Sequence, residues 1–145
     1  MISFENSERI QKQQQYAETV ARERMRPEAR YYDDKEHELP WDFARFIWDT
    51  GRQTLDSLRP GAAVPEEPFM LQMHTTEMLS WGDFGLYMCI PWPALGGNAI
   101  MVSGTEEQKA QLTKKFQGDK PTWTCMALSE SHCGSDSSAI RTRAV

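Results

Sequence analysis

The sequence has no surplus of positive charge. It contains 16 Lys and Arg residues against 21 Asp and Glu residues, which gives a formal net charge of −5. A nucleic-acid interface needs a clustered basic face that neutralises phosphates. Here the basic residues stand among acidic ones, as in Arg22-Glu23-Arg24. We therefore expect solvated helix faces and no nucleic-acid partner.

The sequence also lacks a long apolar run. Its most apolar window, residues 86–102, is interrupted by prolines and glycines. The window is shorter than the roughly 20 residues that a membrane-spanning helix needs. The N-terminal segment MISFENSERIQKQQQ carries charges and glutamines where a secretory signal would need an apolar core. These absences predict a core segment at 86–102, no membrane span and no targeting segment.

Cysteine is scarce, because Cys89, Cys125 and Cys133 are the only three. An odd number without metal-ligand spacing predicts neither a disulfide framework nor a metal site, and it fits a reducing compartment. The expected location is therefore cytoplasmic. The chain of 145 residues is long enough for one ordinary domain, and its 39% hydrophobic content is close to the globular average.

The first third of the chain has helical periodicity. A first helix is expected to start at a cap provided by Ser3 or Asn6 and to run to about Met25. Pro27 should then break or kink it and begin a new turn. A second helix is expected from Pro40, with its apolar side chains on one face.

Glycine and proline residues are expected to interrupt the helices in the region that follows. Gly51 is placed to end the second helix as a left-handed cap. A loop would then run from Arg52 to Pro68, followed by a third helix from about Glu67 to Trp81. The methionine-rich stripe of this third helix is expected to pack into the core.

A last helix has a clear start signal. Thr105 is the expected N-cap, and Gln108 at the third helical position completes a capping box. The helix should cover Glu106 to Phe116, with Ala110, Leu112 and Phe116 facing inward. After Asp119 the composition changes to strand-forming residues, from Thr122 to Leu128. We therefore predict a helical domain at 1–119 and the start of a β domain at 120–145.

The segment Thr124–Arg143 carries the strongest functional signal. An apolar run ends at Ser129 and Glu130, and a small-residue turn containing Gly134 follows. Glycine allows close approach of a ligand, and successive N–H groups in such a turn can form a nest for phosphate oxygens. The Gly-Ser-Asp tripeptide alone is a weak signal, because ordinary surface turns collect the same residues.

The residues Ala127-Leu128-Ser129-Glu130, then two residues, a small residue and Gly134-Ser135-Asp136 form a longer pattern. This pattern resembles the signature that opens the middle domain of the acyl-CoA dehydrogenase family. The usual family form is a small residue, an aliphatic residue, Thr or Ser, then Glu, Pro, Gly, Ala, Gly, Ser and Asp. The similarity continues through residues 139–142 and upstream at 79–83 and 104–109, so it covers most of the chain in the right order.

This resemblance implies a fold and an activity. The fold would be mainly α, with an N-terminal helical bundle domain followed by the first one or two strands of the middle β domain. The activity would be FAD-dependent α,β-dehydrogenation of an acyl-CoA thioester, in which a carboxylate removes the α-proton and a hydride passes to flavin N5. Implied partners are an electron-transfer flavoprotein-type acceptor and further subunits of a homo- or hetero-oligomer. The loop from Arg52 to Pro68 would lie near the substrate entrance.

The resemblance also implies roles for individual residues. The backbone at Met126 and Leu128 would contact the isoalloxazine ring, and the Ser129 hydroxyl would hydrogen-bond to it. Gly134 and Ser135 would lie near the flavin pyrophosphate, with Ser135 also near the thioester arm of the substrate. The remaining carboxylates of the turn, Glu130 and Asp136, are expected to hold its backbone rather than to catalyse.

Three positions depart from the family pattern. Ser131 stands where Pro is usual, His132 where Gly is frequent, and Cys133 where Ala or Gly is usual. A positive φ at His132 would carry strain. A His132–Cys133 nucleophile pair is not favoured, because adjacent side chains seldom point at each other and no third orienting group is evident.

The family's catalytic glutamate comes from a C-terminal helical domain, so we expect no catalytic base in this chain. Two strands alone would be marginally stable, and we therefore expect the chain to be a fragment of a longer enzyme. Two alternatives stay open. One is a non-catalytic helical partner subunit or interaction module, and the other is a stand-alone ligand-binding helical domain.

Overall fold

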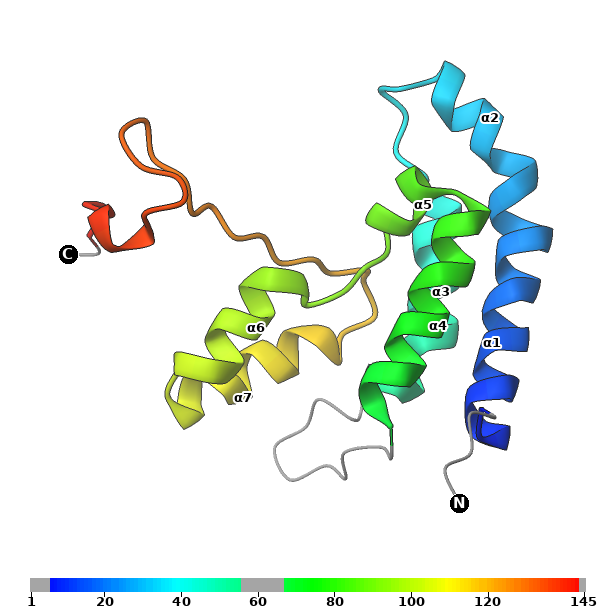
Figure 1. Ribbon diagram of the computed structural model, residues 1–145, viewed down its shortest axis with the longest axis horizontal. Coiled ribbons are helices and arrows are strands. Elements are labelled where there is room, and N and C mark those ends of the chain that lie inside the picture. The colour runs from blue at the N-terminus through cyan, green and yellow to red at the C-terminus, as the bar shows by residue number, and fades with distance from the viewer. Residues whose placement is uncertain (1–5, 56–66, 144–145) are drawn as a thin grey trace.

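The structure is a computed structural model that describes residues 6–55 and 67–143. This part of the chain is mainly helical, as predicted (Figure 1). Its helices are α1 (Glu8–Val20), α2 (Arg26–Asp34), α3 (Trp41–Leu55), α4 (Pro68–Gly82), α5 (Phe84–Met88), α6 (Ala94–Ser103) and α7 (Glu106–Phe116). A π-helical turn, Ala21–Met25, joins α1 to α2, and a 3-10 turn, Ser137–Ala139, lies near the C-terminal end.

The N-terminal helix begins at Glu8 and stays helical as far as Asp34. Ser7 caps it by accepting a hydrogen bond from the Ile10 N–H, so the expectation of Ser3 or Asn6 as the cap is wrong. Pro27 does not break the helix but lies in the first turn of α2. The irregularity falls just before the proline, where the Arg26 N–H donates to the Ala21 carbonyl. This wider turn accommodates a residue that lacks an N–H and would crowd an α-helical carbonyl.

The first hydrophobic core lies between α1, α3, α4 and α5. Its buried side chains include Ala21 and Met25 from the π-turn, Phe43 from α3 and Leu79 from α4. Gly82, at the end of α4, lies so close to Ala21 that an added Cβ would be 2.8 Å from the Ala21 Cβ. The end of α4 therefore lies in close contact with the π-turn.

A second core connects α3 to the α6–α7 helical hairpin. Trp48 of α3 is 1% exposed and packs with Leu112 and Phe116 of α7. The Trp48 indole N–H also donates to the Gly118 carbonyl at 3.2 Å. One tryptophan therefore joins the N-terminal bundle to the later helices.

Two expectations about α3 and α4 are wrong. α3 continues through Gly51 to Leu55, because Gly51 is helical and not in the left-handed conformation that a cap would need. On α4, the prediction for the methionine-rich stripe is wrong for its first half, because Phe69 is 78% exposed and Met73 is 66% exposed. Its second half does pack into the core, where Leu79 is buried and Met78 lies against the same cluster. Residues 56–66 of the predicted loop lie outside the described residues.

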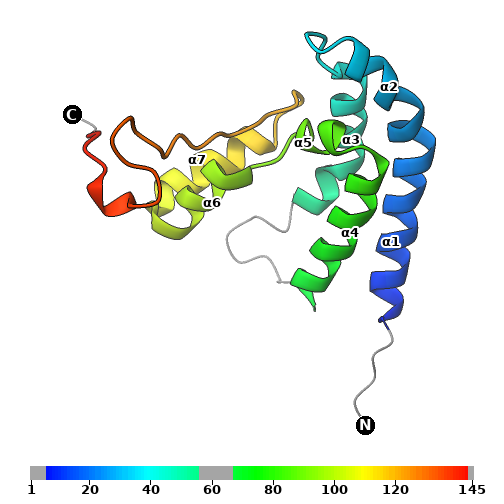
Figure 2. The same cartoon turned by 45° about the horizontal axis from the view of Figure 1, so that its top comes forward.

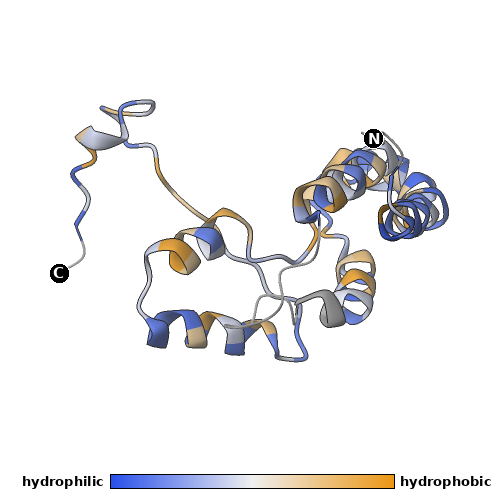
Figure 3. Cartoon of the chain, turned by 60° about the horizontal axis from the view of Figure 1, so that its bottom comes forward, coloured by the Kyte–Doolittle hydropathy of each residue, from blue (hydrophilic) through white to orange (hydrophobic). Residues whose placement is uncertain are grey.

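The apolar segment at 86–102 is only partly a core segment. Leu86 is buried against the first core, but Met88, Leu95 and Val102 are exposed. α6 therefore carries apolar side chains that the rest of the described chain does not cover, and hydrophobic segments are coloured orange along the helices in Figure 3. Apolar residues on several faces of a helix are typical of a protein interior.

The predicted bounds and N-terminal cap of α7 are confirmed. The helix covers Glu106–Phe116, and the Thr105 hydroxyl and the Gln108 side chain form a reciprocal capping box. Leu112 and Phe116 are buried as expected. Ala110 is exposed, so its predicted inward position is wrong.

The predicted strand after Pro121 does not form among the described residues. Residues 121–129 have no helical or strand assignment, and the single β-bridge described in this part of the chain joins Glu130 to Cys133. Strand-forming side chains become a strand only when a second strand pairs with their backbone. The domain boundary near Asp119 stays a prediction.

Candidate functional site

The segment after α7 is attached to the helical part of the chain through Trp123 and Thr124. The Trp123 indole N–H donates to the Cys89 carbonyl at 3.0 Å, and its ring packs edge-on against Trp41 with centroids 5.8 Å apart. The Thr124 hydroxyl accepts from the Gly97 N–H at 2.9 Å and donates to the Pro93 carbonyl. These contacts fix where the chain leaves the helical part.

Gly96 makes this close approach possible. A Cβ added to Gly96 would lie 2.4 Å from the Cys125 carbonyl oxygen and 2.9 Å from the Thr124 hydroxyl. Any other residue at this position would push the segment away from α6.

Beyond Cys125 the chain forms a C-terminal hook, residues 126–143, that extends away from α1 and α2 (Figures 1 and 2). The hook contains every residue that the resemblance assigns to the flavin, namely Met126, Leu128, Ser129, Gly134 and Ser135. All five are exposed. The predicted site residues therefore share one projecting segment.

The tight turn of the hook is formed by Ser131 and His132. The Glu130 N–H donates to the Cys133 carbonyl at 2.9 Å, and the Cys133 N–H donates back to the Glu130 carbonyl at 3.2 Å. His132 does not have a positive φ, since Glu67 and Ala94 are the described non-glycine residues that do. The strain expected at His132 is absent from this described turn.

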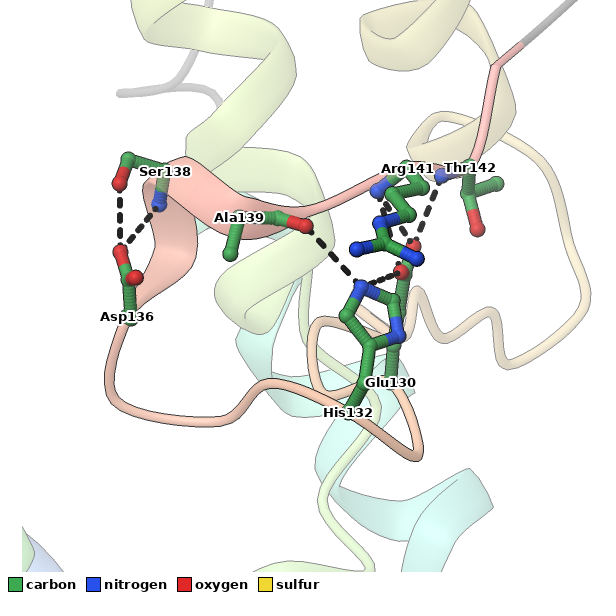
Figure 4. Close-up of polar contacts among 7 residues, drawn as sticks. All are labelled: Glu130, His132, Asp136, Ser138, Ala139, Arg141 and Thr142. Carbon is green, nitrogen blue, oxygen red and sulfur yellow. Dashed lines mark hydrogen bonds and ion pairs between the residues drawn. The ribbon is translucent and has the colours of Figure 1, made fainter.

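The Glu130 carboxylate joins the two arms of the hook (Figure 4). It accepts from the Thr142 N–H at 2.8 Å and from the Arg141 N–H at 3.0 Å and 3.2 Å. Hydrogen bonding from Thr142 and from the Arg141 backbone lowers the pKa of Glu130 below its ordinary value. The geometry thus gives Glu130 the turn-holding role that the sequence predicted.

Asp136 organises the second bend of the hook. One carboxylate oxygen accepts from the Ser138 N–H at 3.2 Å and from the Ser138 hydroxyl at 2.5 Å. This is an N-cap of the 3-10 turn Ser137–Ala139. Asp136 therefore also acts within the backbone of the hook, as expected.

The arm from Met126 to Ser129 offers unused hydrogen-bonding groups. No described residue hydrogen-bonds to the backbone of Met126, Ala127 or Leu128, or to the Ser129 hydroxyl. The side chains of Met126 and Leu128 are 43% and 47% exposed. An extended apolar segment with open backbone groups can pair with a strand or lie against a flat ring.

Gly134 and Ser135 follow the turn. A Cβ added to Gly134 would meet nothing within 4 Å, and its φ is not in the left-handed range. Packing and conformation within the described chain therefore do not require glycine at this position. The space beside it is available to a ligand.

The hook also contains a cluster that the sequence reading missed. Glu130, His132 and Cys133 bring a carboxylate oxygen, a ring nitrogen and a thiol sulfur within 4.8 Å of one another. The prediction had treated His132 and Cys133 as side chains that point apart. The available signal was the Glu-x-His-Cys spacing across a tight turn, which places all three side chains close together.

A separate hollow of about 370 Å³ lies between α6 and α7. It is lined by Ala99, Ile100, Ser103, Gly104, Gln108, Gln111, Leu112 and Lys115. These residues include no carboxylate, histidine or cysteine, so the hollow has no general base or metal ligand.

No protein-family model matches the chain, and no solved structure matches it. Within the described residues, none of the helices is both long enough and apolar enough to cross a membrane.

Proposed function

We propose that this chain is the N-terminal portion of an FAD-dependent, acyl-CoA dehydrogenase-like oxidoreductase. The observation that carries the proposal is the C-terminal hook, in which the motif residues are exposed, their backbone groups are open and Gly134 has no internal role. The mainly helical fold before the hook is consistent with the helical domain that precedes the same motif in that family.

The residues of the hook fit a flavin dinucleotide in chemical type. An extended backbone at Met126 and Leu128 offers donors and acceptors to the edge of a flat ring, and the Ser129 hydroxyl adds one more. Gly134 leaves room for phosphate oxygens to approach the backbone beside Ser135. When bound, FAD would accept a hydride from the β-carbon of an acyl thioester.

Within this scheme, the chain binds and orients and supplies no catalytic base. Glu130 and Asp136 accept hydrogen bonds from backbone N–H groups of the hook, so both are assigned to holding its backbone and neither is assigned as the base. Ser135 is assigned to the thioester arm of the substrate. The α-proton acceptor and the electron-transfer flavoprotein-type acceptor would come from other parts of the assembly.

Titration of the full chain with FAD tests this function. We expect saturable quenching of flavin fluorescence, weakened about tenfold by Ser129→Ala, since one lost hydrogen bond costs about 1 kcal/mol or somewhat more. Ser103→Ala, an exposed hydroxyl on α6, should leave the affinity unchanged. No affinity for FAD, in the presence or absence of an acyl-CoA thioester, would contradict the proposal.

A second candidate function is a non-catalytic helical subunit that binds a partner protein. The observation in its favour is the exposed apolar surface of α4, where Phe69, Met70 and Met73 face outward. Such a chain would be colourless and would associate with another chain through this face. Sedimentation of the full chain and of Phe69→Ser, each alone and mixed with a longer homologous subunit, tests it. A chain that stays monomeric in both conditions, or a Phe69→Ser variant that associates as well as wild type, would exclude it.

A further inference from the structure

The turn of the C-terminal hook places three different metal-binding chemistries together. Glu130 offers a carboxylate oxygen, His132 an imidazole nitrogen and Cys133 a sulfur, all within 4.8 Å of one another. Thiolate, imidazole and carboxylate are the ligand types that bind Zn²⁺ in proteins. We propose that Glu130, His132 and Cys133 bind a divalent transition-metal ion of the Zn²⁺ type.

The spacing of two of the ligands already matches such an ion. The His132 Nε2 and the Glu130 Oε2 lie 3.4 Å apart. Two ligand atoms bound at about 2.0–2.1 Å to a tetrahedral ion are themselves about 3.4 Å apart. A sulfur bound at about 2.3 Å would lie about 3.6 Å from each of them, so the Cys133 thiol needs a shift of about 1 Å at most.

The carboxylate ligand is held in place by a second layer of contacts. The Glu130 Oε1 accepts from the Thr142 N–H, while the Oε2 accepts from the Arg141 N–H and keeps a lone pair toward His132. Ligating carboxylates in metal sites are typically hydrogen-bonded in this way, which fixes their orientation. The His132 Nε2 also lies 3.1 Å from the Ala139 carbonyl oxygen. A metal ion bound to this nitrogen would take the place of the proton in that hydrogen bond.

The three ligands differ in how far they are exposed to solvent. Cys133 is 8% exposed, and the side chains of Glu130 and His132 are 17% and 34% exposed. A partly covered thiolate can be stabilised by an adjacent cation. Three protein ligands leave one position for water, so the ion would be reachable from solvent.

The ion would stabilise the conformation of the hook. Its ligands all come from the four residues of the turn, and Glu130 connects them to the second arm through Arg141 and Thr142. Metal binding would therefore fix both arms together. This role differs from flavin binding, which is assigned to Met126, Leu128, Ser129, Gly134 and Ser135, so failure of one does not imply failure of the other.

Cobalt binding tests the proposal directly. Adding Co²⁺ to the reduced full chain should produce a thiolate-to-cobalt charge-transfer band in the near ultraviolet at one equivalent, and Zn²⁺ should abolish the band. Cys133→Ser should remove the band, and His132→Gln should weaken Co²⁺ binding tenfold or more. The matched controls are Cys125→Ser, an exposed thiol, and His37→Gln, an exposed histidine, and both should keep the wild-type band.

A second measurement needs no variant. Zn²⁺ should slow alkylation of Cys133 in the wild-type chain, read by mass spectrometry of the labelled peptides, without slowing alkylation of Cys125. The proposal is overturned if the wild-type chain shows no charge-transfer band, if the band survives Cys133→Ser, or if Zn²⁺ protects both thiols equally.

Discussion

At the scale of single residues, two glycines show how differently the same residue type can be used. Gly96 is required because a Cβ there would meet the Cys125 carbonyl at 2.4 Å, whereas Gly134 has open space around it. We expect Gly134→Ala to leave the free energy of unfolding within about 0.5 kcal/mol of wild type. The same change should weaken FAD binding, because the methyl group would occupy the space assigned to the pyrophosphate.

Gly96→Ala, unlike Gly134→Ala, should lower the free energy of unfolding. Its clash should cost about 1–3 kcal/mol of stability or detach the segment from α6. Urea unfolding followed by circular dichroism measures the stability of both variants, and fluorescence titration measures FAD affinity. A Gly134→Ala chain that binds FAD normally would remove the assigned role of that glycine.

The thiol of Cys89 should be less reactive at neutral pH than an ordinary cysteine. Burial, with a further contribution from Asp83, raises the pKa of Cys89 above its ordinary value. Since the thiolate is the reactive form, the alkylation rate of Cys89 should increase at a higher pH than that of a cysteine in an unstructured peptide. Peptide mass spectrometry after labelling between pH 7 and about 10 checks this. An ordinary midpoint for Cys89 would contradict the partial burial of its thiol.

The roles of individual residues could be predicted where they depend on residues close by in the sequence. The Thr105–Gln108 capping box involves positions three apart, so the sequence pattern is sufficient. The bonds from Glu130 to Arg141 and Thr142 span 11 and 12 residues, and only their general purpose was predicted. The approach of His132 to Cys133 was missed, because it depends on how a tight turn aims neighbouring side chains.

At the scale of secondary-structure elements, the π-turn at Ala21–Met25 explains how α1 and α4 pack. An added Cβ on Gly82 would lie 2.8 Å from the Ala21 Cβ and 3.1 Å from the Met25 sulfur. Gly82→Ala should therefore destabilise the chain by about 1–3 kcal/mol. Gly51→Ala is the matched control, because its Cβ would meet nothing within 4 Å inside a helix.

The control should change stability in the opposite direction. Replacing an unencumbered helical glycine by alanine stabilises a helix by about 0.5–1 kcal/mol. Urea unfolding of the two variants in parallel checks both signs. Equal effects at the two positions would show that helix propensity outweighs the close contact at Gly82.

The errors at this scale have a common physical origin. Gly51 was expected to end a helix, and it lies within one. Pro27 was expected to break or kink the helix and to begin a new turn, and it lies in the first turn of α2 without breaking the helical segment. A π-turn accommodates the proline, and a glycine that is not in the left-handed conformation simply continues the helix. The strand predicted after Pro121 did not form among the described residues, because a strand requires a partner that sequence preference cannot supply.

At the scale of the whole molecule, Trp48 connects the two halves of the described chain. It packs on Leu112 and Phe116 and donates a hydrogen bond to the Gly118 carbonyl. We expect Trp48→Ala to cost about 3–5 kcal/mol, because it leaves a cavity between α3 and α7. Trp48→Phe should retain most of the packing and lose mainly the hydrogen bond, at about 1 kcal/mol.

Chemical denaturation distinguishes these outcomes. If Trp48 joins the halves, Trp48→Ala should separate unfolding into two steps, whereas Trp48→Phe should keep one. The mainly helical architecture was predictable from periodicity. The outward-facing apolar side chains of α4 and α6 were not, because the number of apolar residues does not show which of them the rest of the chain covers.

The division into two cores has a consequence for synthesis. Every buried member of the first core, from Ala17 to Leu86, precedes residue 90, whereas Trp48 waits for Leu112 and Phe116. Chains fold from the N-terminus as they emerge from the ribosome. The first core can thus form while Trp48 is still exposed. Its indole ring remains an exposed apolar surface that chaperones can bind until α7 has been translated.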